Sequence, residues 1–379
     1  MLIGRIRKNV RADLESPPEL RQFGTGWLSG VAALVTSVGG LFLVLCLRYP
    51  SLLTVPPLRS FYLNAWFRLA LHFLLIVAFM LSILSLMLRV NKVLGFTAMS
   101  AVLLATVIGG LRVESHGELT TGVFLGLDWF VLNVIFTGFL FVPVERLFPH
   151  RKGQSLFRNE WREDLFYFLV SSLLIQLMTF LSMAPAIALA AHTSWTTFRG
   201  WVASQQVVIQ VVEIMFLTDL VQYWVHRAFH RVPFLWGFHS IHHSATSMDW
   251  MAAARLHLFE NIAIRATTVI PMYLVGFSAA ALHAYILLVY IHTSFVHGNI
   301  NWNLDQVGRF LVTPRYHHWH HGIDKEAVDV NFAIHFPILD HLFGTHHFPP
   351  HEWPEGYGIN NQSMPRSYWR QLFYPFSRK

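Results

Sequence analysis

Histidine is the residue type of this chain whose spacing could do chemistry. Of the 22 histidines in the sequence, 18 lie between residues 226 and 351. Nine of these fall into four groups, which are His226 and His230; His239, His242 and His243; His297; and His317, His320 and His321. Imidazole is the commonest metal-binding side chain. The number and the clustering of these histidines therefore predict a metal centre that holds more than one ion.

The spacing within the groups is helical. Residues at i, i+3 and i+4 lie on one face of a helix. His226 and His230 are four residues apart, and two segments repeat the pattern His-x2-His-His. We therefore expect each group to aim its imidazoles at one point from a single turn. Eight ligands from three helices, with His297 as a ninth, suit two metal ions with positions left open for substrate and O2.

The alternative is a set of polar histidines at a membrane surface or in a solvated loop. A single His-x3-His pair would favour that interpretation, but the repeated pattern argues against it. The chain has one cysteine, Cys46, and no His-Glu-x2-His segment, so thiolate sites and that type of zinc protease are not supported. Imidazole suits Zn, Cu, Fe and Ni. Two irons fit the ligand count best, although the count by itself does not distinguish the metals.

Composition indicates a membrane protein. The 379 residues are 54% hydrophobic and 13% charged, whereas soluble domains are about 25% charged. The net charge of +7 has a simple explanation, because Lys and Arg accumulate on the cytoplasmic side of membrane spans. No basic patch accompanies a recognisable nucleic-acid-binding fold, so nucleic acid is not an expected partner.

Several apolar runs reach the length of about 20 residues that a membrane span needs. The candidate spans are 27–47, 69–88, 93–111, 123–143, 165–191 and 207–225. A further apolar stretch, 262–296, separates two histidine groups, which must lie on one side of the membrane if both bind one centre. It must therefore cross an even number of times or not at all. Pro271 and Gly276 interrupt it, as expected at the bend of a hairpin or re-entrant segment.

Basic residues in the connections predict the orientation. Residues 1–24 carry five Lys or Arg, and 89–92 and 144–164 are also basic, whereas 112–122 has only Arg112 against Glu114 and Glu118. The positive-inside rule then places the N-terminus and the histidine site in the cytoplasm. The predicted fold is all-α, a polytopic transmembrane helical bundle with a cytoplasmic helical cap that carries a histidine-rich di-metal site.

Longer motifs surround the histidines. The first two are Asp219-x3-Tyr223-Trp224-x-His226-Arg227-x2-His230 and Leu235-Trp236-x-Phe238-His239-x2-His242-His243-Ser244. The next two are Phe295-Val296-His297-Gly298-Asn299-Ile300 and Thr313-Pro314-x2-His317-x2-His320-His321. The last two are Asp329-x-Asn331-Phe332 and Asp340-x2-Phe343-Gly344-Thr345. In this order they resemble the fatty acid hydroxylase/sterol desaturase superfamily of integral-membrane di-iron oxygenases. Leu339 and Ala333 stand where that family often has Trp and Gly, and the first 140 residues match no motif of it.

The resemblance implies an activity. It implies two non-haem iron ions and O2 as co-substrate, with the nine histidines as ligands, in an enzyme that hydroxylates or desaturates a lipid. Sterol, fatty acyl, sphingolipid, ether-lipid and carotenoid substrates all remain open. Electrons would come from an external carrier such as a cytochrome b5-like or ferredoxin-like protein. The implied domains are residues 149–347 as the catalytic domain, 1–148 with about four spans of unknown role, and 348–379 as a cytoplasmic tail.

Five further residues are candidates for the site. Asp219 is a charged residue within an apolar run, and we expect its carboxylate to accept a hydrogen bond from a ligand imidazole. Asn331 and Asp340 are expected to fix the cap around the ligands. His257 lies in Arg255-x-His257-x2-Glu260, which resembles a family segment with Leu258 in place of Pro, and His292 lies five residues before His297. Both are possible additional ligands.

Two other function classes use histidine in membranes. A histidine-rich metal-binding or metal-transport protein usually has irregular His-x-His tracts and acceptor residues within its spans. A bis-histidine haem protein needs a histidine on each of two spans, and His72 is the clear mid-span histidine of the first four. The helical spacing observed here favours the lipid oxygenase over both.

Overall fold

The computed structural model describes residues 2–14, 16–62, 64–112, 123–360 and 364–377. The predicted loop residues Glu114 and Glu118 lie outside the described residues. Among those described, the secondary structure is helical apart from one isolated bridge between Gly322 and Tyr357, which agrees with the all-α prediction. The chain divides into two compact units, one of residues 1–134 and 172–176, the other of residues 135–171 and 177–379.

The first unit is built on three packed helices, α2 (Trp27–Arg48), α5 (Ala65–Leu88) and α6 (Val93–Val107). Small residues bring these helices together, as is usual in membranes. A Cβ at Gly30 would lie 2.6 Å from Ser85 Oγ, and one at Gly40 would lie 2.7 Å from Leu75. The unit also contains α1 (Leu2–Leu14), α3 (Pro50–Leu53), α4 (Pro56–Tyr62) and the short 3-10 helices Pro18–Arg21 and Gly110–Arg112.

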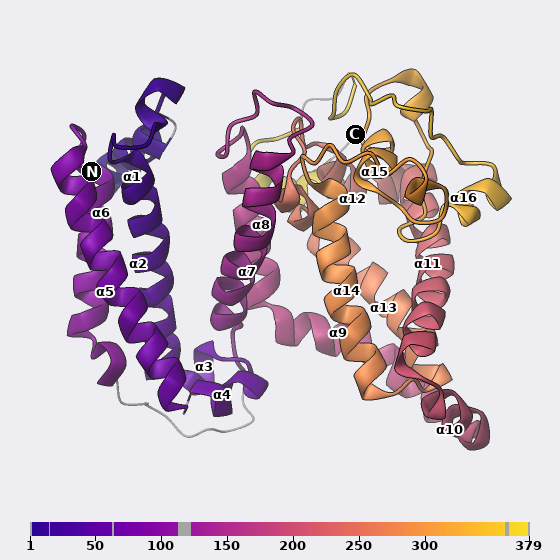
Figure 1. Cartoon of the computed structure of the whole chain (residues 1–379). Coiled ribbons are helices and arrows are strands. Elements are labelled where there is room, and N and C mark those ends of the chain that lie inside the picture. The colour runs from indigo at the N-terminus through magenta and orange to yellow at the C-terminus, as the bar shows by residue number, and fades with distance from the viewer. Residues whose placement is uncertain (1, 15, 63, 113–122, 361–363, 378–379) are drawn as a thin grey trace. The chain divides into compact units, whose positions relative to one another are not determined.

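The second unit includes residues 226–321, the segment that carries the nine histidines with helical spacing (Figure 1). Its long helices are α11 (Val207–Arg231), α13 (Leu258–Val275) and α14 (Ala279–His297), joined by most of α7 (Leu127–Leu147). Its other α-helices are α8 (Trp161–Leu173), α9 (Ile175–Ala190), α10 (Thr196–Ser204), α12 (Pro233–His243), α15 (Pro314–His320), α16 (Ile338–Phe343) and α17 (Tyr368–Ser377). Three 3-10 helices cover Trp250–Ala254, Val307–Arg309 and Lys325–Ala327.

Six described helices are long and apolar enough to cross a membrane, which are α2, α5, α7, α11, α13 and α14. The predicted span 165–191 is instead a pair, α8 and α9, bent by 63°, which makes a seventh span if the pair counts as one. The predicted span 93–111 is the 15-residue helix α6, about 22 Å long, which is short of the hydrocarbon thickness of about 30 Å. The chain is a multi-pass integral membrane protein.

The stretch 262–296 forms a helical hairpin. Helix α13 ends at Val275, and the next residue, Gly276, has a left-handed φ of 84°. Ser278 caps the start of α14 by accepting from Ala281 N. A glycine is required at the turn, because a Cβ there would also lie 2.7 Å from the Arg199 side chain. Pro271 lies inside α13 and does not interrupt it. The hairpin returns the chain to the side from which α13 started, as the histidine groups on either side of it require.

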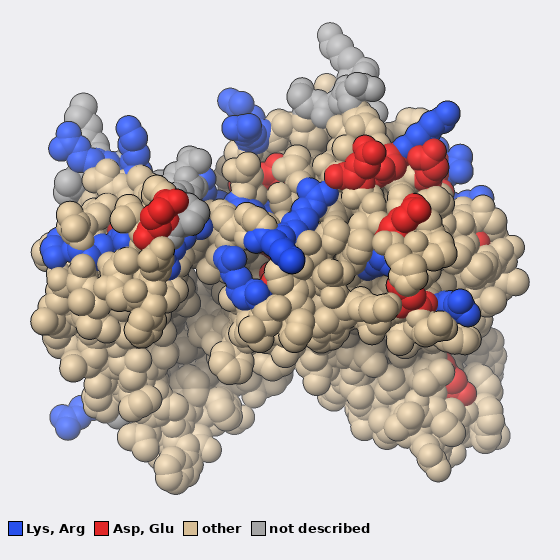
Figure 2. Space-filling model, turned by 45° about the horizontal axis from the view of Figure 1, so that its top comes forward, with Lys and Arg blue, Asp and Glu red and all other residues tan. Residues whose placement is uncertain are grey.

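The cap gathers at the end of the second unit where α11 and α14 finish. Helix α11 stops at Arg231 because Pro233 follows, and Pro233 then occupies the first turn of α12. In Figure 2 the charged side chains of this unit gather toward the cap, and much of the remaining face is uncharged. The predicted tail 348–379 includes a helix, α17, that packs against α12. The domain boundaries at residues 148 and 347 stay predictions.

Candidate metal centre

All nine histidines with helical spacing converge in the cap as two neighbouring clusters. The five-histidine cluster consists of His226, His230, His239, His243 and His320. The four-histidine cluster consists of His242, His297, His317 and His321. Within each cluster, one ring nitrogen per histidine lies within 4.8 Å of all the others. The clusters adjoin, because the rings of His243 and His321 stack with centroids 4.4 Å apart.

Each His-x2-His-His segment is divided between the clusters. His239 and His243 point into the five-histidine cluster, whereas His242 between them points into the other. The prediction that each group aims at one point was therefore wrong for these segments. On a helix, residues three apart are rotated by about 60° in one sense and residues four apart by about 40° in the other, so positions i+3 and i+4 point about 100° apart. The same rule puts His317 and His321 together and sends His320 to the opposite cluster.

Backbone carbonyls fix two imidazoles of the five-histidine cluster. His226 Nδ1 donates to Phe332 O at 2.9 Å, and His320 Nδ1 donates to Val330 O at 2.8 Å. A carbonyl oxygen can only accept, so Nδ1 must carry the proton. The Nε2 lone pair of each ring then points into the cluster, which is the tautomer that a metal ligand needs.

Carboxylates hold two more imidazoles of this cluster. His239 Nδ1 is hydrogen-bonded to Glu260 Oε1, and the Glu260 carboxylate is completely buried. His230 Nδ1 lies 3.4 Å from Asp329 Oδ1. A carboxylate behind a ligand imidazole orients the ring and makes it a more basic ligand. Glu260 was the functional residue that the sequence interpretation missed, although it belongs to the segment in which His257 was considered.

In the four-histidine cluster, backbone carbonyls hold two of the imidazoles. His242 Nδ1 donates to Arg255 O at 3.1 Å, and His297 Nδ1 donates to Thr293 O at 2.8 Å. The Arg255 side chain is buried and forms an ion pair with Asp164. This ion pair holds the backbone of residue 255, and therefore its carbonyl, in place against His242.

The inward nitrogens of these rings face one another closely. Nε2 of His226 lies 3.0 Å from Nε2 of His239, and Nε2 of His242 lies 3.2 Å from Nε2 of His297. In both pairs Nδ1 is engaged with an oxygen acceptor, so both Nε2 atoms present lone pairs and neither can donate. Such facing lone pairs repel unless a cation lies between them. The donor set thus fits a bound metal ion in each cluster.

Burial lowers the pKa of most of these imidazoles and so favours their neutral form. Eight of the nine histidines are buried as whole residues. The ninth, His230, has a side chain that is only 5% exposed. Burial and the neighbouring imidazoles lower the pKa of His243 and His317 well below the ordinary value. Burial likewise lowers the pKa of His320 to about 3. Since a metal ion binds the deprotonated nitrogen, these rings are ready for a cation without losing a proton.

Asp340 secures the loop that supplies the carbonyl acceptors. Its carboxylate accepts from the backbone N–H groups of Phe332 and Ala333, at 2.8 and 3.0 Å, and from the Tyr316 hydroxyl at 2.9 Å. Asn331 extends the same support, since its side-chain amide donates to Tyr316 O at 3.1 Å. Both residues therefore act on the cap, where they were expected.

Asp219 also contacts this loop and not an imidazole. Its buried carboxylate accepts from the backbone N–H groups of Ile334, His335 and Phe336, at 2.8, 3.1 and 2.6 Å. Asp219 was expected to accept a hydrogen bond from a ligand imidazole. Glu260 makes that kind of contact instead, with His239. Asp219 instead connects α11 to the segment that follows Phe332. The carbonyl oxygen of Phe332 accepts the hydrogen bond from His226.

The two possible additional ligands lie outside the clusters. His257 caps α13, since its Nδ1 accepts from Phe259 N at 3.1 Å, and its Nε2 donates to Leu372 O at 3.0 Å. His292 Nε2 donates to Val312 O at 3.0 Å. The structure engages both nitrogens of His257 and Nε2 of His292 in hydrogen bonds to the backbone.

Comparison with known proteins agrees with this site. The family profile described as fatty acid hydroxylase matches residues 211–345, which contain all nine histidines. An ornithine lipid hydroxylase of Rhizobium tropici is 27% identical over 260 residues, 67% of this chain and 77% of that protein. A putative methylsterol monooxygenase of Dictyostelium discoideum is 26% identical over 62% of this chain and 86% of that protein.

Other relatives match over a smaller part of their length. An alkylglycerol monooxygenase of Caenorhabditis elegans is 29% identical over 148 residues, 38% of this chain and 28% of that protein. No solved structure matches significantly. The matched segment coincides with the helices and loops that build the two histidine clusters. The chain is thus a multi-pass membrane oxidoreductase whose residues 211–345 match the fatty acid hydroxylase family.

Proposed function

We propose that each histidine cluster holds one iron ion and that the protein uses O2 to hydroxylate a membrane lipid. The observation that carries this proposal is the pair of clusters whose Nε2 lone pairs face inward while oxygen acceptors hold Nδ1. Neutral nitrogen ligands suit iron among the transition metals. Bound iron would supply the activation of O2 and the oxidation of an unactivated C–H bond.

The chain's own residues would position the ions and keep the site dry. The nine imidazoles would bind the ions, and burial would exclude water. The carbonyls of residues 255, 293, 330 and 332 and the Glu260 carboxylate orient five of the nine rings. Hydroxylation balances as one C–H bond and O2 giving one C–OH and one water, with two electrons and two protons consumed. The sequence carries no haem, flavin or nicotinamide motif, so the electrons would come from a separate cytochrome b5-like or ferredoxin-like protein.

We infer a bilayer lipid as the substrate class. The relatives are named for ornithine lipid, methylsterol and alkylglycerol. These molecules differ in their polar parts but share long or bulky apolar parts that partition into a bilayer. All three names denote insertion of oxygen, which favours hydroxylation over desaturation. A site at the end of membrane helices α11 and α14 would receive such a molecule directly from the membrane.

The centre is proposed to face the cytoplasm. The basic connection 144–164 lies on the cap side, because Asn299 O, two residues after His297, accepts from His150 N at 3.3 Å. Arg158 of this connection is buried in ion pairs with Asp164 and Asp249, but Arg146 and Lys152 are exposed, and the positive-inside rule applies to them. A Lys325→Cys variant labelled by an impermeant reagent from outside intact cells would contradict this orientation.

The proposal is tested on the purified, full-length protein. Elemental analysis should find about two irons per chain, and incubation with a membrane lipid extract, an electron donor and isotopically labelled O2 should place one labelled oxygen in a lipid. Metal bound in both clusters with no oxygen transferred after iron reconstitution would favour a metal-binding protein. Absence of any bound metal would overturn the assignment of the clusters.

A further inference from the structure

The C-terminal helix α17 is attached to a helix that carries cluster histidines. Its buried residues are Tyr368, Gln371 and Pro375. Tyr167 donates to Gln371 Oε1 at 2.8 Å. A Cβ on Gly237 of α12 would lie 3.3 Å from Pro375, so the two helices meet without space for a larger residue. Helix α17 is therefore a fixed part of the cap.

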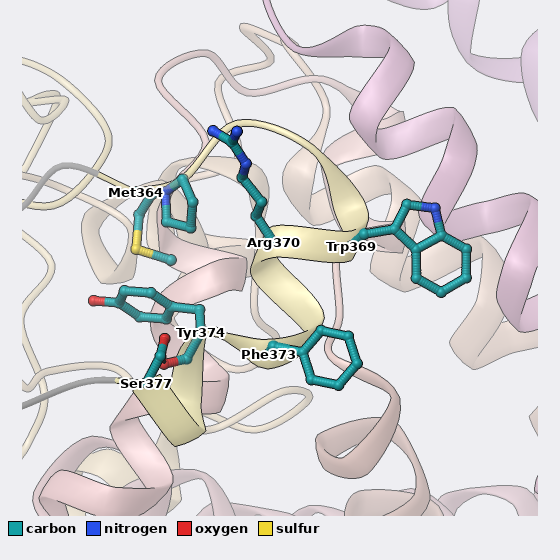
Figure 3. A pocket seen from close by; sticks show the side chains of 7 residues that line it. Met364, Trp369, Arg370, Phe373, Tyr374 and Ser377 are labelled. Carbon is teal, nitrogen blue, oxygen red and sulfur yellow. Dashed lines mark hydrogen bonds between the residues drawn. The ribbon is translucent and has the colours of Figure 1, made fainter.

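Another face of α17 is aromatic and exposed. Trp369, Phe373 and Phe376 are 62%, 63% and 67% exposed. They stand at i, i+4 and i+7, which places them on one helix face, and Figure 3 shows Trp369 and Phe373 projecting to the same side. Three large aromatic side chains with this exposure on one short helix form an apolar patch, and such a patch marks an interaction surface.

The charge on this segment has one sign. Arg366 and Arg370 are exposed, and the sequence from residue 364 to the end contains no Asp or Glu. Arg370 also borders an open groove of about 620 Å³ beside the helix (Figure 3). An amphipathic helix with Trp and Phe on its apolar face and Arg on its polar face is typical of helices that lie in the membrane interface.

The aromatic face is continuous with the end of a membrane span. Phe259 lies in the first turn of α13, a candidate span, and is 48% exposed. The rings of Phe259 and Phe376 both pack against Phe238, with centroids 4.7 and 5.5 Å apart from it. Helix α17 thus lies beside the first turn of α13, at one end of this candidate span. Phe238 immediately precedes His239 in the chain.

We propose that α17 is an interfacial helix that docks on the lipid bilayer. Trp369, Phe373 and Phe376 lie at the boundary of headgroups and acyl chains, and Arg366 and Arg370 reach phospholipid phosphates. Because α17 is packed against α12, this contact anchors the histidine clusters at the depth where lipid chains begin. The anchoring depends on no bound metal and on no activity, so it goes beyond the proposed function.

The test measures where α17 lies in full-length protein. Spin labels are placed at Trp369→Cys and Phe373→Cys in a Cys46→Ala background, and the protein is reconstituted in phosphatidylcholine vesicles containing phosphatidylglycerol. Accessibility to O2, which partitions into the bilayer, is compared with accessibility to a water-soluble nickel chelate. Matched controls are Ile286→Cys, on the exposed apolar surface of α14, and Lys325→Cys, in the exposed cap.

The proposal expects both α17 labels to have an O2-to-nickel ratio well above that at position 325 and below that at 286. These positions are exposed, so the substitutions should leave the fold intact. A ratio equal to that at position 325 would overturn the proposal, because α17 would then face water. Protection from both reagents, with dipolar coupling between labels on different molecules, would overturn it in favour of a second copy of the chain.

Discussion

The two histidine clusters both consist of imidazoles, but they differ in the oxygen atoms that contact the outer ring nitrogen, Nδ1. In the five-histidine cluster, carboxylates of Glu260 and Asp329 back two of the rings. In the four-histidine cluster, the described oxygen partners of Nδ1 are the neutral carbonyls of Arg255 and Thr293. A carboxylate partner strengthens an imidazole as a ligand for a cation. This difference predicts that the same side chain binds a metal ion with unequal strength in the two clusters, because its hydrogen-bond partner differs.

The number of histidines in each cluster also predicts stronger metal binding by the five-histidine cluster. A metal site with more protein ligands has fewer positions free, whereas catalytic sites keep a position open for substrate or solvent. The five-histidine cluster is therefore the candidate for the more tightly held ion, and the four-histidine cluster is the candidate for the ion that exogenous ligands reach. Three sets of variants test this distinction.

The largest effect is expected from removing two ligands from one cluster at a time. His243→Ala/His320→Ala removes histidines only from the five-histidine cluster, and His317→Ala/His321→Ala removes histidines only from the other. Each double variant should lose turnover by more than about 100-fold, since even partners of ligands account for factors of 10–100. Elemental analysis should find about one metal ion per chain instead of two.

His346→Ala is the control for these variants. Its ring stacks on His341 with centroids 3.6 Å apart, and it belongs to neither cluster, so both metal content and turnover should remain near those of the unaltered protein. Loss of both ions in either double variant would contradict the assignment of two separate metal sites, because the clusters would then bind metal as one cooperative site. Full turnover in both double variants would mean that the clusters take no part in the reaction.

An intermediate effect is expected from Glu260→Gln. The amide keeps the size of the side chain but removes the negative charge behind His239. Metal affinity of one ion should fall by about 10–100-fold, measured by competition with a chelator. Thr293→Ala is the matched control in the other cluster, because it leaves the backbone carbonyl that accepts from His297 in place. Equal metal affinity in the two variants would mean that the Glu260 carboxylate does not strengthen its cluster.

The smallest effect is expected from His257→Asn. His257 caps α13 with its Nδ1, and Asn is an effective N-cap residue, so the helix should keep its start. Because His257 lies outside both clusters, metal content should stay at about two ions per chain. A loss of one ion, measured by elemental analysis beside the unaltered protein, would make His257 a ligand and enlarge the site.

Local periodicity identified the nine histidines that the structure gathers into two clusters. The spacing of His226 and His230, or of His239 and His243, is a property of one helical turn and needs no tertiary contact. The same reasoning did not predict that each His-x2-His-His segment is divided between the clusters, because it assumed that the side chains of His242 and His243 point the same way. Membrane spans were equally predictable from apolar length, except that 93–111 proved short and 165–191 bent at a break between α8 and α9.

The amino-acid sequence by itself determined that the chain spans membranes and that nine histidines stand at helical spacing, since composition and periodicity are local properties. The tertiary structure decided which oxygen faces each imidazole. His226 meets the carbonyl of Phe332, 106 residues away in the chain, and His239 meets Glu260 rather than Asp219. These pairings depend on how α11, α12, α13 and the cap loop pack, because a hydrogen bond forms only where packing brings donor and acceptor within about 3 Å.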